Sequence, residues 1–458
     1  MKRSAFGFGV RTMDAVRQTG CLPLTLLRRK SRLWAALLRQ GFAAAAPKLE
    51  ERRRGFRPTG VRKVPRAGPW GSTDAVQPDT ALTVHVSTAL KEIEEREWNA
   101  IFPHTPEGYH FFRVIEATLS RQFTFYYISI YRGSRIVCLA PCFLTEYSLD
   151  ATVDGPLKTL AIWVKRASPR LLTTRILVCG SPTGEGRLGI VTADLPRTAP
   201  LLVEAMRALA RRAGAQLLAF KDFSPSYASF FEALSKMKFH HMPSYPSAEL
   251  EITFPSFEAY LASLSKATRK DLRRKFKKSD TLHVDMQVRS DLGDLLDQAY
   301  QLYLNTFERS EIKFELITKE FFEQISRALP AETRYFLWRI DGRLVAVDLC
   351  LVSGSTLVDE YLGMDYDVAY KYHLYYLTFR DILTWCIQHG IRRYSGGTIN
   401  YDPKKRLDFT FVPQTIAFKH TNRLMNLVFG LIGLLVNPEN FDPLLKSLNQ
   451  RSLHDANR

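Results

Sequence analysis

Long apolar runs are missing from this sequence. No stretch reaches the roughly 18 to 20 consecutive apolar residues that a helix needs to cross a bilayer, and the nearest run, Leu427–Val436, contains Gly430 and Gly433. We therefore interpret residues 425–458 as a C-terminal helical tail whose apolar run packs on the body of the protein. Peripheral contact with a membrane surface is the alternative for the same run.

Clustered cysteines are missing as well. The six cysteines are scattered, and most lie within apolar runs, which is typical of reduced core residues in a reducing compartment. They are Cys21, Cys138, Cys142, Cys179, Cys350 and Cys386. The segment from Cys138 to Cys142 lacks the spacing of a zinc-binding pair, and the sequence has no second pair. We therefore predict no metal.

Acidic residues are nearly missing from the N-terminal segment. Residues 1–72 hold 17 Lys and Arg against Asp14, Glu50 and Glu51, so 14 of the 18 net positive charges lie there. The other +4 is ordinary for a soluble enzyme, and we predict no DNA partner. We interpret residues 1–80 as a basic leader that is either an organelle transit peptide, a disordered extension or sequence upstream of the true start. The predicted location is the cytoplasm, with organelle import as the alternative.

The rest of the chain contains two similar β-hairpins about two hundred residues apart. One covers Tyr126–Phe143 and turns at Gly133, and the other covers Tyr335–Val352 and turns at Asp341-Gly342. Both share their flanks: a helical pattern precedes each hairpin, and a strand, a helix and a last strand follow it. This shared order predicts an α/β (α+β) fold of two duplicated units, each a mixed sheet flanked by helices.

A strongly basic helix lies between the two units. Eight Lys and Arg occur between Lys266 and Lys278, while Leu272 and Phe276 keep an apolar face. One interpretation is a solvated connecting helix. The other is a clamp for the phosphates of a ligand or of RNA.

The second unit carries the denser pattern. We expect a strand at Thr356–Gly363, a helix at His373–His389 ended by Gly390, and a short strand at Ile391–Ser395. An irregular polar loop, Gly396–Phe409, follows at the carboxyl end of that last strand, where ligands commonly bind in α/β folds.

These features resemble the tandem GNAT-fold N-acyltransferases, which include the Fem-type aminoacyl transferases of peptidoglycan synthesis and many uncharacterised bacterial acetyltransferase-like proteins. The resemblance is densest in Leu362–Asp365, in Tyr372–Tyr376 and in Gly396–Tyr401 with Lys404 and Phe409. It implies a GNAT-like domain at 81–255, a basic linking helix at 256–280 and a second GNAT-like domain with the active site at 281–424.

The same resemblance implies the donor. In the GNAT pattern the central strand offers backbone N–H groups, and the following turn, here Asp365–Tyr370, holds the pyrophosphate of coenzyme A. The Arg/Gln-x-x-Gly-x-Gly/Ala signature of that turn is absent here, and Fem-type relatives share this departure. Acyl-CoA and aminoacyl-tRNA therefore both stay open as donors, and an RNA partner is expected only in the second case.

Acyl transfer to an amine needs a base, and the candidates are carboxylates. We predict Asp359, Glu360 and Asp348 as candidate catalytic acids, and strand alternation lets only one of Asp359 and Glu360 face the cleft. Tyr401 in the polar loop is a further catalytic candidate.

For cofactor binding we predict Lys404, His373 and Tyr370. The favoured function is transfer of an acyl or aminoacyl group to an amine of a cell-envelope, saccharide or peptide precursor. The alternatives are a catalytically inactive scaffold protein and an RNA-binding module.

Overall fold

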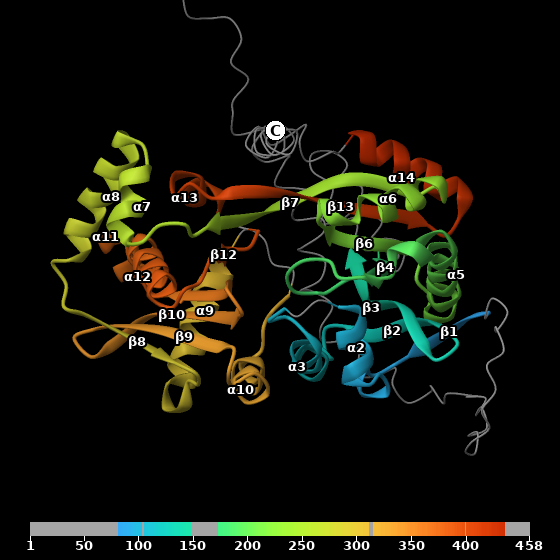
Figure 1. The fold of residues 1–458 in the computed structure, drawn as a ribbon, viewed down its shortest axis with the longest axis horizontal. Helices are drawn as coiled ribbons and strands as arrows, with labels where there is room; N and C mark the ends of the chain where they lie inside the picture. The colour runs from blue at the N-terminus through green and yellow to red at the C-terminus, as the bar shows by residue number, and fades with distance from the viewer. Residues whose placement is uncertain (1–80, 103–104, 149–172, 311–314, 399, 436–458) are drawn as a thin grey trace, which may run out of the picture.

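The computed structural model describes residues 81–102, 105–148, 173–310, 315–398 and 400–435 (Figure 1). The basic leader and most of the predicted tail lie outside these residues. The described strands form one mixed sheet with helices on both of its faces. The predicted fold class is confirmed. Among the described residues, no helix combines the length and the apolar character that a membrane span requires.

The first unit follows the order that the sequence predicts. Its principal elements are β1 (Leu82–Ser87), α2 (Glu95–Ile101), α3 (Tyr109–Leu119), β2 (Thr124–Arg132), β3 (Arg135–Ser148), β4 (Thr173–Cys179), β5 (Gly189–Ile190), α5 (Leu195–Ala213), β6 (Leu217–Phe223), α6 (Ala228–Lys236) and β7 (His240–Glu251). β2 and β3 form the predicted hairpin.

Two helices link the units. α7 (Phe257–Ser263) and α8 (Lys266–Ser279) are separate because the Ser265 side chain caps α8 by accepting a hydrogen bond from the N–H of Thr268. The predicted basic helix therefore begins at Lys266 and not at Ser263.

The second unit repeats the same order. Its principal elements are β8 (Val284–Arg289), α9 (Leu296–Arg309), α10 (Lys319–Ala328), β9 (Thr333–Ile340), β10 (Arg343–Ser353), β11 (Thr356–Met364), α11 (Tyr366–Tyr372), α12 (Leu374–Gln388), β12 (Arg393–Ser395), α13 (Tyr401–Arg406) and β13 (Thr410–His420), and α14 (Arg423–Leu435) follows it.

The units exchange their last strands. The strand order is β1-β2-β3-β4-β6-β13-β7-β12-β11-β10-β9-β8, so β13 of the second unit pairs with β6 of the first, and β7 of the first pairs with β12 of the second. On one face of the sheet, α3 and α10 also pack together, with the rings of Phe111 and Phe321 6.0 Å apart. The exchange and this contact bind the two halves into one body.

Two predicted loops are partly helical. The predicted cofactor turn Asp365–Tyr370 is largely α11, because the side chain of Asp365 caps it by accepting from the N–H of Asp367. The polar loop after β12 contains α13. The helix predicted from His373 begins at Leu374, since His373 has a left-handed backbone with φ 56°, and Gly390 follows its end with φ 69° as expected.

Candidate active site

The central strand of the second unit separates from its neighbour. β11 pairs in parallel with β12 at Thr356, Leu357 and Val358, whereas β11 itself continues to Met364. Beyond Val358, this edge of β11 therefore borders an opening, and its backbone N–H and C=O groups are available to a ligand. A cavity of about 1130 Å³ lies at the opening and is lined by residues of both units.

A β-bulge brings two consecutive carboxylates of β11 to the cavity. In the ladder with β10, Leu349 lies opposite Tyr361 and Cys350 lies opposite Asp359, so Glu360 is the extra residue. Asp359 and Glu360 both line the cavity. The expectation that only one of them can face the cleft is wrong, because it assumes a regular alternation that the bulge interrupts.

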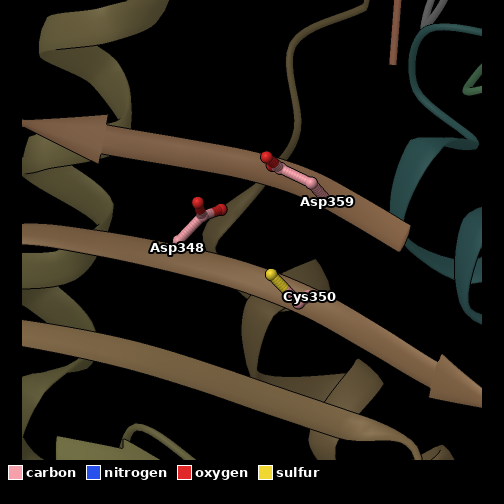
Figure 2. A group of neighbouring side chains, drawn as sticks. All are labelled: Asp348, Cys350 and Asp359. Atoms are coloured by element: carbon pink, nitrogen blue, oxygen red, sulfur yellow. The ribbon is translucent and has the colours of Figure 1, made fainter. Parts of the chain in front are cut away.

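Asp359 belongs to a buried polar network at the floor of the opening. Figure 2 shows the Asp348 and Asp359 side chains on the neighbouring strands β10 and β11, close to Cys350. The Tyr394 hydroxyl donates to Oδ2 of Asp359 at 2.8 Å. Lys404, whose side chain is also buried, donates from Nζ to the backbone carbonyl of Gly396.

Burial shifts the titration of this network. It raises the pKa of Asp348 well above the usual range, and the neighbouring Asp359 raises it further. Burial also raises the pKa of Asp359, but Lys404 and the Tyr394 hydroxyl oppose the rise. Burial lowers the pKa of Lys404 to about 8 against the attraction of both carboxylates. We therefore assign the shared proton to Asp348, which donates to an ionised Asp359.

The same carboxylates raise the question of a metal. One potential ligand atom each from Asp348, Cys350 and Asp359 lies within 4.8 Å of the others (Figure 2). Lys404 already brings a positive charge to both aspartates. A divalent cation would have to compete with that ammonium group, so the residues present fit a lysine-neutralised network better than a metal site. The absence of a metal stays a prediction.

One wall of the cavity comes from the first unit. Arg187 forms an ion pair with Glu107, and its Nη1 donates to the Thr105 hydroxyl at 2.7 Å. Glu185 lies beside them on the wall, and burial raises its pKa while a hydrogen bond with Ser247 opposes the rise. This end of the cavity is therefore rich in carboxylates.

Glu360 lies where that wall meets β11. Burial raises its pKa well above the usual range, the charge of Glu107 raises it further, and Arg187 opposes the rise. Its Oε1 is buried and has no hydrogen-bond partner among the described residues. A buried carboxyl oxygen without a partner is costly, so a donor group from a ligand would stabilise it.

The other end of the cavity has basic surroundings. His373, Tyr370, Tyr376 and Arg309 line it. Burial lowers the pKa of His373, and so do the nearby charges of α8, chiefly that of Lys275. Nζ of Lys275 also lies 3.7 Å from the centre of the Tyr376 ring.

The structure brings most of the predicted site residues to one cavity. Those that line it are Asp359, Glu360, Lys404, His373 and Tyr370. Asp348 lies beneath them and is 1% exposed. Tyr401 lies outside the cavity lining: its hydroxyl donates to the carbonyl of Pro246 at 2.8 Å, and its ring stacks on that of Tyr245. The roles of all seven residues stay predictions.

The sequence analysis missed the wall residues Glu107, Glu185 and Arg187, as well as Tyr394. The glycines around Glu185 attracted attention only as a weak phosphate-loop pattern. The structure gives one of them a packing role instead, since a Cβ on Gly186 would lie 2.2 Å from the carbonyl oxygen of Lys221. No local pattern in the sequence connects this loop with β11, more than 170 residues later.

Comparisons with known proteins identify the second unit. Residues 266–405 match the family described as Acetyltransferase (GNAT) domain. A curated relative, the putative 8-amino-7-oxononanoate synthase 2 of Mycobacterium tuberculosis (strain CDC 1551 / Oshkosh), is 25% identical over 262 residues, which are 56% of this chain and 34% of the relative. The chain thus spans about a third of the length of the curated relatives it matches.

Several solved structures are similar in fold. FemX shares 13% identity with a TM-score of 0.48, covering 71% of this chain and 96% of that one. A tandem GNAT protein from the clavulanic acid biosynthesis pathway shares 12% identity with a TM-score of 0.46, covering 75% and 99%. The C-terminal domain of a putative lysylphosphatidylglycerol synthetase from Agrobacterium fabrum shares 13% identity with a TM-score of 0.46, covering 75% and 96%. At such identities these likenesses say nothing about substrates.

The resemblance inferred from the sequence motifs is thereby confirmed. The family match covers the basic helix α8 and the second unit as far as α13. The first unit repeats the same order of helices and strands. The division of the chain at residues 81–255, 256–280, 281–424 and 425–458 stays a prediction.

Proposed function

Because this chain carries a GNAT domain and repeats its element order, we propose that it is an N-acyltransferase that moves an acyl or aminoacyl group from an activated donor to an amine. The observation that carries the proposal is the opening between β11 and β12 with Glu360 at its edge. A separated strand pair exposes backbone N–H groups, and a buried carboxylate beside them can serve as a base.

The proposed reaction has two parts. The amine nitrogen attacks the acyl carbon of the donor, and Glu360 accepts the proton that the nitrogen loses. The bond from the acyl carbon to the leaving sulfur or oxygen then breaks, and the leaving group takes up that proton. Backbone N–H groups of β11 beyond Val358 stabilise the negative charge that develops on the acyl oxygen.

Glu360 suits the role of base better than Asp359. The carboxylate of Asp359 already accepts from Tyr394 and lies beside Lys404. Glu360 has a buried oxygen without a hydrogen-bond partner among the described residues, and a raised pKa brings it nearer to the pH at which it must exchange a proton. In this scheme Asp348, Asp359 and Lys404 position the strands that border the opening.

The charges along the cavity suggest which substrate binds at which end. Carboxylates gather near the first unit, at Glu107, Glu185 and Glu360, whereas His373 faces the basic helix α8. A cationic amine favours the acidic end, and an anionic donor favours the basic end. The two substrates would then meet beside β11.

A thermal-shift titration followed by a transfer assay tests this function. Acetyl-CoA, longer acyl-CoAs and aminoacyl-tRNA serve as donors, with amines on saccharides, peptides and cell-envelope precursors as acceptors. A donor that binds the folded state raises the melting temperature in proportion to its concentration above Kd. Absence of both stabilisation and transfer with every donor would instead support the scaffold protein.

A further inference from the structure

The helix α8 carries a line of positive charges along one side. Lys270, Arg274 and Lys278 follow one another at four-residue spacing, so they project from the same side of the helix. All three are exposed. The one acid among residues 266–278 is Asp271, which pairs with Arg274 and with the buried Lys275. The side therefore keeps a clear positive excess.

This line of charges borders the donor end of the cavity. The hydroxyl of Ser279, at the end of α8, donates to the carbonyl of Tyr372 at 2.6 Å. Lys275 lies over the ring of Tyr376, and the charges of Lys275, Lys278 and Arg274 all lower the pKa of His373. Tyr376 and His373 line the cavity, so α8 forms its rim.

The usual place for donor phosphates is blocked by an acid. At the N-terminus of α11, where free N–H groups would attract an anion, the carboxylate of Asp365 already accepts from the N–H of Asp367. Asp365 also pairs with Arg343 at 2.7 Å. A phosphate there would meet a negative charge, so it needs cations from another element.

We propose that the line Lys270, Arg274 and Lys278 binds the phosphate groups of a nucleotide-type acyl donor, with coenzyme A as its carrier. The proposal rests on the proposed function, since it names the donor class of that same site. The line spans about 12 Å at the rise of an α-helix, which suits several phosphates better than one. The exposed ring of Tyr370 at the cavity edge offers a surface on which a base can stack.

Binding of coenzyme A and of dephospho-coenzyme A, measured by calorimetry without any acceptor, tests the proposal. We expect the double variant K270A/K278A to bind coenzyme A about tenfold more weakly than the wild type, with a reduced salt dependence. The wild type should prefer coenzyme A over its dephospho form, and the variant should lose that preference. The control K277A/K236A removes two exposed lysines elsewhere and should bind as the wild type does.

The outcomes separate this subsite from the proposed function. Equal coenzyme A affinity in K270A/K278A and its control would overturn the subsite, while transfer activity would leave the function intact. Lysine-dependent binding without transfer to any amine would overturn the function and keep the subsite. A wild type that ignores coenzyme A but binds uncharged tRNA through Lys270 and Lys278 would overturn the proposed carrier in favour of RNA.

Discussion

The two units differ at the end of their central strand. In the second unit, β11 continues beyond its pairing with β12 and leaves an opening. In the first unit, β4 pairs with β6 as far as Cys179, its last residue. The chain then folds back against β6, and the N–H of Gly186 donates to the carbonyl of Asp222 at 2.8 Å. The corresponding place is therefore filled by the protein itself.

This difference explains why the cavity is shared. The loop that fills the first unit also presents Glu185 and Arg187 to the cavity beside β11. Exchange of the last strands places β7 next to β12, so the wall and the opening belong to one continuous sheet. One copy of the duplicated unit can thus keep a reactive opening while the other copy shapes it.

Glu360→Gln gives the largest expected effect, because it breaks the chemistry of the open unit. We expect the transfer rate to fall by about 10²- to 10⁴-fold, the usual contribution of a general base, with the donor Kd unchanged. Steady-state kinetics and donor calorimetry measure both. In the closed unit, Glu185→Gln makes the same chemical change on the wall, and it should raise the KM of the amine with little change in kcat. Equal loss of kcat in both variants would contradict the division of roles.

Gly186→Ala is expected to disturb the closed unit. The added Cβ would lie 2.2 Å from the carbonyl oxygen of Lys221 and 2.5 Å from the Phe223 ring, so the loop must move. We expect a loss of about 2 kcal/mol in the free energy of unfolding, which is typical of overpacking, together with weaker amine binding as Arg187 shifts. Urea denaturation measures the first effect.

Gly354→Ala is the matched control for that substitution. Its Cβ would meet nothing within 4 Å, and only its left-handed φ of 57° opposes a side chain. A cost of about 1 to 2 kcal/mol without any change in amine KM is expected. An unchanged amine KM in Gly186→Ala would show that the loop does not shape the cavity.

The sequence predicted the repeated elements because their signals are local. Asp341-Gly342 forms the turn between β9 and β10, and both hairpins have the predicted pairing. The helix end at Gly390 follows from glycine's tolerance of a left-handed backbone. Such features depend on a few neighbouring residues, so they can be inferred without knowledge of the tertiary fold.

The assembled site depends on contacts that no local pattern encodes. The bulge at Glu360 arises from the register between β10 and β11, and alternation alone predicts the wrong facing. Strand exchange and the loop at Glu185 join residues far apart in the chain. Tyr401 shares the short helix α13 with Lys404, yet Tyr401 faces β7 and Lys404 faces the opening. A loop assignment could not separate these two directions.

Lys404 offers a third comparison, based on the charge buried at the opening. Its folded pKa of about 8 lies below the ordinary value of 10.5, so between these values the unfolded chain binds a proton that the folded protein lacks. The contribution of this group to stability is therefore present above about pH 10.5 and is lost as the pH falls through about 8.

Urea denaturation across this pH window measures the effect. Lys404→Met should remove the rise in stability that the wild type shows from about pH 8 to pH 10.5. Lys405→Met changes the next, exposed residue of α13 and should retain the rise. The same slope in all three proteins would show that Lys404 does not titrate in this range.

Tyr401→Phe should give the smallest effect, because the hydroxyl that it removes joins the two units away from the opening. Loss of the hydrogen bond to the Pro246 carbonyl should lower the free energy of unfolding by about 1 kcal/mol and leave the transfer rate unchanged. Tyr394→Phe removes the hydroxyl that donates to Asp359 instead, so it should alter the pH profile of the rate. If Tyr401→Phe slowed transfer as much as Tyr394→Phe, α13 would contribute both of its sides to the chemistry, and the seam between the units would belong to the active site.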